Sequence, residues 1–219
     1  MKLLNTLALL IFCQLAVTAQ NFQFDKQINF EIYENGKLKE YPQARALVGA
    51  ENTMGARVVL EEDAGAQYSV VDFNKGKIKI LMRQFGQKVA LETDINTEQL
   101  DVLGVSDVPV TEDKKIKKEI IGVKCRSFKG TKDNKTVIIH VGNFGADLKG
   151  YESFTKAICE KAGIELKDKE VILGVEMIDN QSKGSFQAFV RDIKEKSFKI
   201  DTSSYTTLGS SGSFGIPGF

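Results

Sequence analysis

The chain has 219 residues, of which 42% are hydrophobic, and its 30 lysines and arginines are balanced by 29 aspartates and glutamates. This near-neutral balance offers no overall positive charge to attract a phosphate backbone or an anionic membrane surface, so nucleic acid is not expected as a partner. The length suits one domain of ordinary size with a substantial core.

The first residues have the pattern of a cleavable secretory signal peptide. Lys2 supplies a positive charge, a long apolar stretch follows, and small residues precede a cleavage point after Ala19. An apolar run of roughly 15 residues is shorter than the ~20 that a membrane-spanning helix needs. Acylation at Cys13 is disfavoured because Phe12 stands where a small residue is expected. We therefore predict a signal peptide over residues 1–19, no transmembrane segment in the mature chain, and a periplasmic or secreted protein.

The mature chain opens with the alternation of a strand that buries one face. Polar residues occupy the odd positions, and apolar residues occupy most of the even ones. The apolar positions are Phe22, Phe24, Ile28, Phe30 and Ile32. The pattern ends at Asn35-Gly36, which predicts a hairpin because both central residues of such a turn must accept a positive φ.

Further strands are expected up to the middle of the chain. Residues 43–60 suit either two strands or a helix, and we favour strands with a loop at residues 49–55. A second hairpin is predicted from the apolar runs at residues 68–73 and 78–82, and residues 98–111 read as a connection.

Apolar and β-branched runs predict five more strands in the second half. They cover residues 120–128, 136–141, 171–178, 186–190 and 198–200.

One helix is expected between residues 149 and 161. Tyr151, Phe154, Ala157 and Ile158 recur there at helical spacing, and Gly163 supplies a C-terminal stop. The apolar stripe of this helix should pack on the sheet.

Many strands joined by short turns, with one main helix, indicate a β-rich α+β fold. We expect a strongly curved antiparallel sheet, or half-barrel, with the helix packed on one face. The domain should cover residues 20–201. A flexible tail rich in Ser, Gly and Thr should follow over residues 202–219, because it offers little apolar surface to bury.

The sequence contains no recognisable catalytic, metal-binding or nucleotide-binding motif. His140 is the single histidine, and no cysteine or carboxylate lies near it at ligand spacing. A sheet histidine that faces solvent or is hydrogen-bonded locally is therefore expected. Phosphate-binding glycine loops and a Gly-x-Ser-x-Gly turn are lacking, and the acidic run at residues 61–63 suits a solvated hairpin tip. We predict no enzyme activity, no metal and no cofactor.

Two cysteines, Cys125 and Cys159, remain after removal of the signal peptide. An exported chain meets an oxidising compartment in which such a pair can form a disulfide. Two buried free thiols are the alternative, and the spacing does not decide between them.

Two segments of the chain carry a resemblance to a known family. They are Tyr68-Ser69-Val70-Val71-Asp72-Phe73 followed by Lys77-Ile78-Lys79-Ile80, and Lys115-Ile116-Lys117-Lys118-Glu119-Ile120-Ile121-Gly122-Val123-Lys124-Cys125-Arg126. They resemble the exported bacterial domain of unknown function 4412 family, in which a strand ending in Asp leads into a basic hairpin and a Lys-x-Ile-x-Gly-x-x-Cys element opens the next sheet segment. The chain departs from that family in having no Trp after the cysteine.

The order of strands and helix is also similar to that of LolA-like lipoprotein carriers, in which a curved sheet and a helix enclose an apolar groove. That resemblance implies a binding module for an apolar or acyl ligand in the envelope. The groove candidates are Phe24, Ile28, Phe30, Ile32, Phe154 and Ile158. A structural or protein-interaction domain with a filled core is the alternative.

We expect the mature protein to begin at Gln20 and to be recovered from the periplasm or the medium, because signal peptidase removes such leaders after small residues. N-terminal sequencing of the secreted fraction checks this. Recovery of Met1 in a membrane fraction would contradict it.

Overall fold

The computed structural model describes residues 21–39, 43–59, 67–84, 86–96, 104–105 and 107–208. The predicted signal peptide, the acidic run at residues 61–63 and most of the predicted tail lie outside these residues.

The described residues form one large sheet of 14 strands. In chain order the strands are β1 (Asn21–Glu34), β2 (Lys37–Leu38), β3 (Gln43–Val48), β4 (Thr53–Val59), β5 (Gln67–Asp72), β6 (Lys77–Gln84), β7 (Gln87–Asp94), β8 (Thr111–Glu112), β9 (Lys118–Ile120), β10 (Val123–Lys132), β11 (Lys135–Asn143), β12 (Glu170–Asp179), β13 (Ser185–Asp201) and β14 (Thr206–Leu208). The segment that suited strands or a helix therefore contains two strands, β3 and β4.

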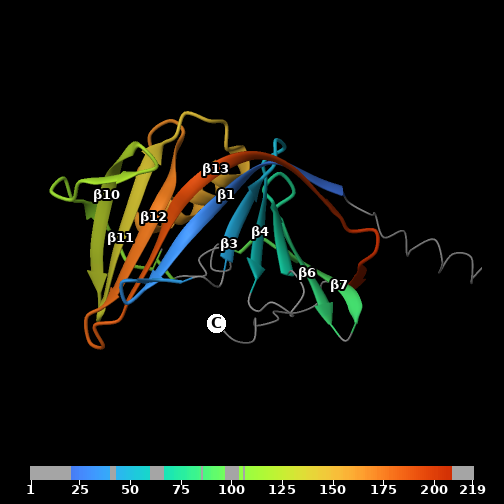
Figure 1. Ribbon diagram of the computed structural model, residues 1–219, viewed down its shortest axis with the longest axis horizontal. Coiled ribbons are helices and arrows are strands. Elements are labelled where there is room, and N and C mark those ends of the chain that lie inside the picture. The colour runs from blue at the N-terminus through green and yellow to red at the C-terminus, as the bar shows by residue number, and fades with distance from the viewer. Residues whose placement is uncertain are drawn as a thin grey trace, which may run out of the picture.

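The two longest strands, β1 and β13, pair in the middle of the sheet. Strands β3 to β7 follow in order beside β1, whereas β12, β11, β10 and β8 follow beside β13. The sheet arches from β10 and β11 at one end, over β13 and β1, to β6 and β7 at the other end (Figure 1). All strand pairs are antiparallel except β14 with β7. The predicted fold class, a curved sheet with one main helix, is confirmed, with this one parallel pair added.

Strand β14 lies inside the segment predicted to be a tail. Its residues Thr206, Thr207 and Leu208 lie opposite Val89, Ala90 and Leu91 of β7. Because β14 follows β13 after a short turn, the chain crosses from the centre of the sheet to its far edge at this point. The beginning of the predicted tail thus belongs to the sheet.

Helix α3 covers Lys149–Ala162, close to the predicted bounds. Gly163 ends it in the left-handed conformation, with φ of 80°, and its N–H donates to the carbonyl of Glu160. The helix contacts β3 and β4 on one side and β12 on the other, so the sheet curves around it. Tyr151 Oη donates to the carbonyl of Ile172 at 2.7 Å, which ties the helix to β12.

The helix approaches β4 closely at Gly150, where a Cβ atom would overlap the main-chain carbonyl of Thr53. Replacing a helical glycine with alanine normally stabilises a helix by about 0.5–1 kcal/mol. Here we expect Gly150→Ala to destabilise the fold by about 1–3 kcal/mol, because the helix must move off the sheet.

Urea unfolding followed by circular dichroism measures this change. Gly184→Ala is the control, since its Cβ would meet only side-chain atoms, the nearest being Ser182 Oγ at 3.2 Å. A Gly150→Ala protein as stable as the wild type would contradict the close packing.

Candidate functional site

Apolar residues occupy both faces of the sheet. On β3, Ala46 and Val48 belong to a cluster that includes Tyr151 of α3, whereas Leu47 between them belongs to a different cluster. Side chains on a strand alternate between faces, so one cluster lies on the face that α3 covers and the other on the opposite face. The opposite-face cluster, here called the outer cluster, contains Phe22, Phe24, Leu47, Val70, Leu81, Ala90 and Ile200.

The predicted groove residues are divided between these two faces. Phe24 is fully buried in the outer cluster, and Ile28 is fully buried in the helix-face cluster. A register shift in the β1–β13 ladder lies between Phe24 and Lys26, and a bulge of this kind changes which face the following side chains occupy. The one local sign of this shift in the sequence is Lys26, a polar residue that interrupts the apolar even positions.

The remaining groove candidates lie on the helix face. Ile158 is buried, with 3% exposure, whereas Phe30, Ile32 and Phe154 are half-buried. The rings of Phe30 and Phe154 both lie near the Tyr151 ring, at centroid distances of 6.5 and 5.9 Å. The structure therefore brings Phe30 and Phe154 together around Tyr151 and leaves parts of both accessible.

Neighbouring strands extend this half-buried surface. Ile32 lies opposite Ala188 of β13, and Phe186 lies opposite Met177 of β12, all on the helix face. Ala188 in turn lies opposite Val175, a member of the core beneath α3. We call this surface the concave strip. Its members are Phe30, Ile32, Phe154, Met177, Phe186 and Ala188, all half-buried.

A polar network lies on the other face of the same part of the sheet. His140 is fully buried, with Nδ1 2.9 Å from Ser127 Oγ and Nε2 2.8 Å from Glu176 Oε1. Gln187 Nε2 donates to Glu176 Oε2 at 2.8 Å. The four side chains come from four adjacent strands, β10 to β13. His140 is thus hydrogen-bonded locally, one of the two roles expected from the sequence.

Lys118 of β9 covers this network. Its Nζ lies 3.9 Å from the centroid of the Phe189 ring and 3.7 Å from Glu176 Oε1. A cation over an aromatic face is stabilised by the ring quadrupole. Strand β9 therefore closes the network on its open side.

Ser127, His140 and Glu176 are hydrogen-bonded in series, and they are the residue types of the catalytic triad of a hydrolase. Such a triad requires a serine hydroxyl that can reach a substrate. Ser127 has 2% exposure and His140 has none. In this conformation the network satisfies buried polar groups and joins four strands.

The two cysteines are free thiols in the structure. Cys159 is buried in the core beneath α3, and Cys125 packs against a second cluster, whose members include Ile120 and Leu173. Burial raises the pKa of Cys159 to about 12 and that of Cys125 to about 11. Both thiols are therefore expected to stay protonated near neutral pH.

The described residues contain no group of three or more His, Cys, Asp or Glu side chains placed to hold a metal ion. Within the same part of the chain, no helix has both the length and the apolar character needed to cross a membrane.

Comparisons with known proteins give weak similarities. No family model matches the chain, and no curated protein matches its sequence. The chain is similar to PNGF-II at 8% identity and a TM-score of 0.49, over 84% of this chain and 30% of that one. It is similar to a LolA superfamily protein from Nitrosomonas europaea at 8% identity and a TM-score of 0.33, over 81% and 86% of the two chains. A DUF1329 family protein from Desulfovibrio piger gives 8% identity and a TM-score of 0.19, over 84% and 89%.

At these TM-scores and identities the similarities carry no conclusion about activity, and the chain spans under a third of the PNGF-II chain. The structural neighbours do include a LolA superfamily protein. The resemblance to the domain of unknown function 4412 family has no support from a family model.

The hydrogen bond from His140 lowers the pKa of Glu176 below its ordinary value of 4.5. A lowered folded-state pKa contributes stability that is present above the unfolded pKa and is lost as pH falls through the folded pKa. We expect Glu176→Gln to cost about 1 kcal/mol at neutral pH, and we expect this cost to shrink below pH 4.5.

Urea unfolding at neutral and acidic pH measures both effects. Glu160→Gln is the matched control, because Glu160 forms an exposed pair with Lys156 and should change stability by less than about 0.5 kcal/mol. A cost for Glu176→Gln that is equal at both pH values would show that the carboxylate charge does not stabilise the network.

Proposed function

We propose that this protein is an exported, non-enzymatic binding module that takes an acyl chain or another apolar ligand on the concave strip. The observation that carries the proposal is the row of half-buried apolar side chains between α3 and strands β1, β12 and β13. Contiguous apolar surface that a fold leaves accessible is typical of a ligand or partner site. Export follows from the predicted signal peptide.

The strip suits an acyl chain better than a polar ligand. Its members are aromatic and aliphatic, and the buried side chains beneath it, Ile139, Val175 and Ile158, are apolar as well. Each methylene that an acyl chain transfers from water to such a surface contributes about 0.8 kcal/mol. Such a ligand needs exclusion of water more than it needs hydrogen bonds.

A structural or protein-interaction domain is the second candidate, and a specific observation favours it. Phe24, Ile28 and Ile158, half of the predicted groove residues, are buried side chains of closed clusters. A protein partner could then cover the half-buried strip in place of a lipid.

Binding of dansyl-undecanoic acid, followed by the rise in its fluorescence, tests the acyl proposal. Ile32→Lys should weaken binding by about tenfold or more, because it places a charge on the strip. Leu38→Lys is the matched control, since Leu38 lies outside the strip and is 55% exposed; it should bind like the wild type.

Mass spectrometry of a lipid extract from the purified protein would identify a retained ligand. Absence of saturable binding by the wild type, or equal binding by the Ile32→Lys and Leu38→Lys proteins, would overturn the acyl proposal in favour of the interaction domain.

A further inference from the structure

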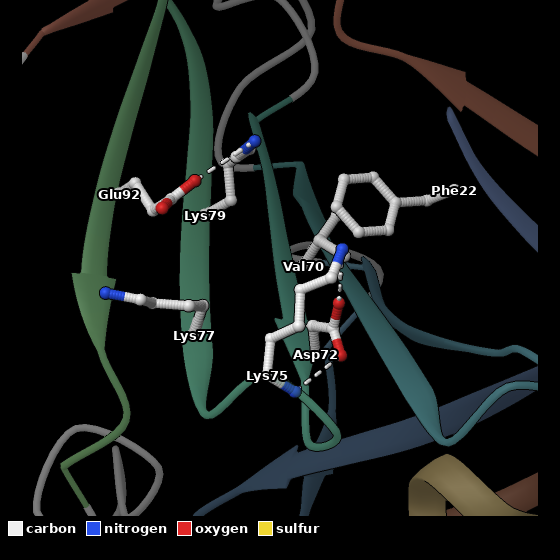
Figure 2. A pocket seen from close by; sticks show the side chains of 7 residues that line it. All are labelled: Phe22, Val70, Asp72, Lys75, Lys77, Lys79 and Glu92. Carbon is white, nitrogen blue, oxygen red and sulfur yellow. Dashed lines mark hydrogen bonds and ion pairs between the residues drawn. The ribbon is translucent and has the colours of Figure 1, made fainter. Parts of the chain in front are cut away.

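A cavity of about 240 Å³ lies on the outer face of the sheet, away from the concave strip. Strands β5, β6 and β7 provide most of its walls, and Phe22 at the start of β1 also lines it (Figure 2). The lining residues are Phe22, Val70, Asp72, Lys75, Lys77, Lys79 and Glu92. This volume is below the roughly 300–1,000 Å³ of sites for drug-sized ligands, so the cavity suits a small molecule.

The apolar part of the cavity is an extension of the outer cluster. Phe22 and Val70 belong to that cluster and have 4% and 1% exposure. A compact apolar group could rest on them without disturbing the core beneath.

Two charged groups on the wall are nearly buried. The side chains of Lys79 and Asp72 are 10% and 9% exposed. Lys79 Nζ lies 3.2 Å from Glu92 Oε2, and Asp72 Oδ1 accepts the Lys75 N–H at 3.1 Å. Removing such charges from water is unfavourable unless the folded protein compensates for the lost hydration, so two nearly buried charges beside an accessible cavity are unusual.

Each charge has a more exposed partner of opposite sign. Glu92 is 35% exposed, and Lys75, whose Nζ lies 3.5 Å from Asp72 Oδ2, is 61% exposed. Figure 2 shows the Lys79–Glu92 pair and the Lys75–Asp72 pair as two separate groups around the cavity. Exposed partners of this kind can swing into solvent at little cost.

The strand register places Lys79 and Asp72 on one face of the sheet. Lys79 lies opposite Val70, and Asp72, two residues along β5, lies opposite Lys77. Such diagonal neighbours have Cα atoms about 7–8 Å apart. One small molecule can therefore span the two charges while its apolar part rests on Val70.

The site as a whole is electrically balanced. Lys77 Nζ lies 2.6 Å from Asp94 Oδ1, so each of the three lysines has its own carboxylate. A ligand with net charge would upset this balance, whereas a zwitterion would not.

We propose that this cavity binds a small zwitterion with a compact apolar side chain, the chemistry of a free α-amino acid. Lys79 holds the carboxylate, Asp72 holds the ammonium group, and Phe22 and Val70 contact the side chain. The proposal is independent of acyl binding on the concave strip, because the two surfaces lie on opposite faces of the sheet.

Isothermal titration of the wild-type protein with three probes that share an isobutyl group tests the charge requirement. L-Leucine carries both charges, isovalerate only the carboxylate, and isoamylamine only the ammonium group. We expect saturable binding of leucine and at least about tenfold weaker binding of the other two, because each lacks one charge-assisted contact. No saturable binding of leucine, or equal binding of isovalerate, would overturn the proposal.

Substitutions of the lining residues test whether leucine binds in this cavity. Lys79→Met and Asp72→Asn remove one charge each and should each weaken leucine binding by about tenfold or more. Lys156→Met is the matched control, because the Lys156 side chain is exposed on α3, and it should bind leucine like the wild type.

Thermal unfolding of each variant verifies that it is folded. Leucine binding that survives both cavity substitutions would place the ligand elsewhere and overturn the assignment. Ile32→Lys should leave leucine binding unchanged, so failure of the acyl proposal and failure of this one are distinguishable.

Discussion

The pairing of β1 with β13 is the constraint on which the rest of the molecule depends. It runs from Asn21 opposite Asp201 to Glu34 opposite Phe186 and joins the two ends of the domain. The remaining strands are added outward from this pair, one half beside each partner. Contacts between residues so distant in sequence carry a large entropy cost of loop closure, which must be met before the pairing stabilises the fold. The β1–β13 ladder therefore joins the two halves of the sheet into one cooperative unit. Without it, the local hairpins of each half would not be connected.

The irregularities in this ladder matter as much as its length. The register shift between Phe24 and Lys26 sends the start of β1 to the outer face, where Phe22 and Phe24 cover β3 to β6, while Ile28 stays on the helix face. A bulge also increases the local twist of a strand, which fits the arch of the sheet. The start of β1 thus contributes Phe22 to the outer cavity, while its later residues Phe30 and Ile32 belong to the concave strip.

The sequence predicted those features that have a local cause. Alternation and turn residues predicted the hairpins, and helical spacing with Gly163 predicted α3 almost to its bounds. The bulge after Phe24 was missed because a bulge is defined by the pairing with β13, where three residues of β13 are spanned by two of β1; its one local sign is the polar Lys26 among the apolar even positions. The contact of His140 with Glu176, 36 residues away, was missed for the same reason. The basic hairpin containing Lys77 and Lys79 was noticed, but only the register could place Asp72 and Lys79 around one cavity.

The two polar clusters of the sheet show why a buried charge can be structural in one place and available to a ligand in another. Glu176 receives hydrogen bonds from His140 and Gln187, and Lys118 covers it, so its oxygens are satisfied by the protein. Lys79 is buried to a similar degree, yet its partner Glu92 is accessible and a cavity adjoins both. The Lys79 side chain is already largely removed from water in the folded chain, so a ligand carboxylate that replaces Glu92 gains a contact without repeating most of that cost. A charged group that the fold has already removed from water, and that lies beside a cavity, is well placed to bind a small ligand with specificity.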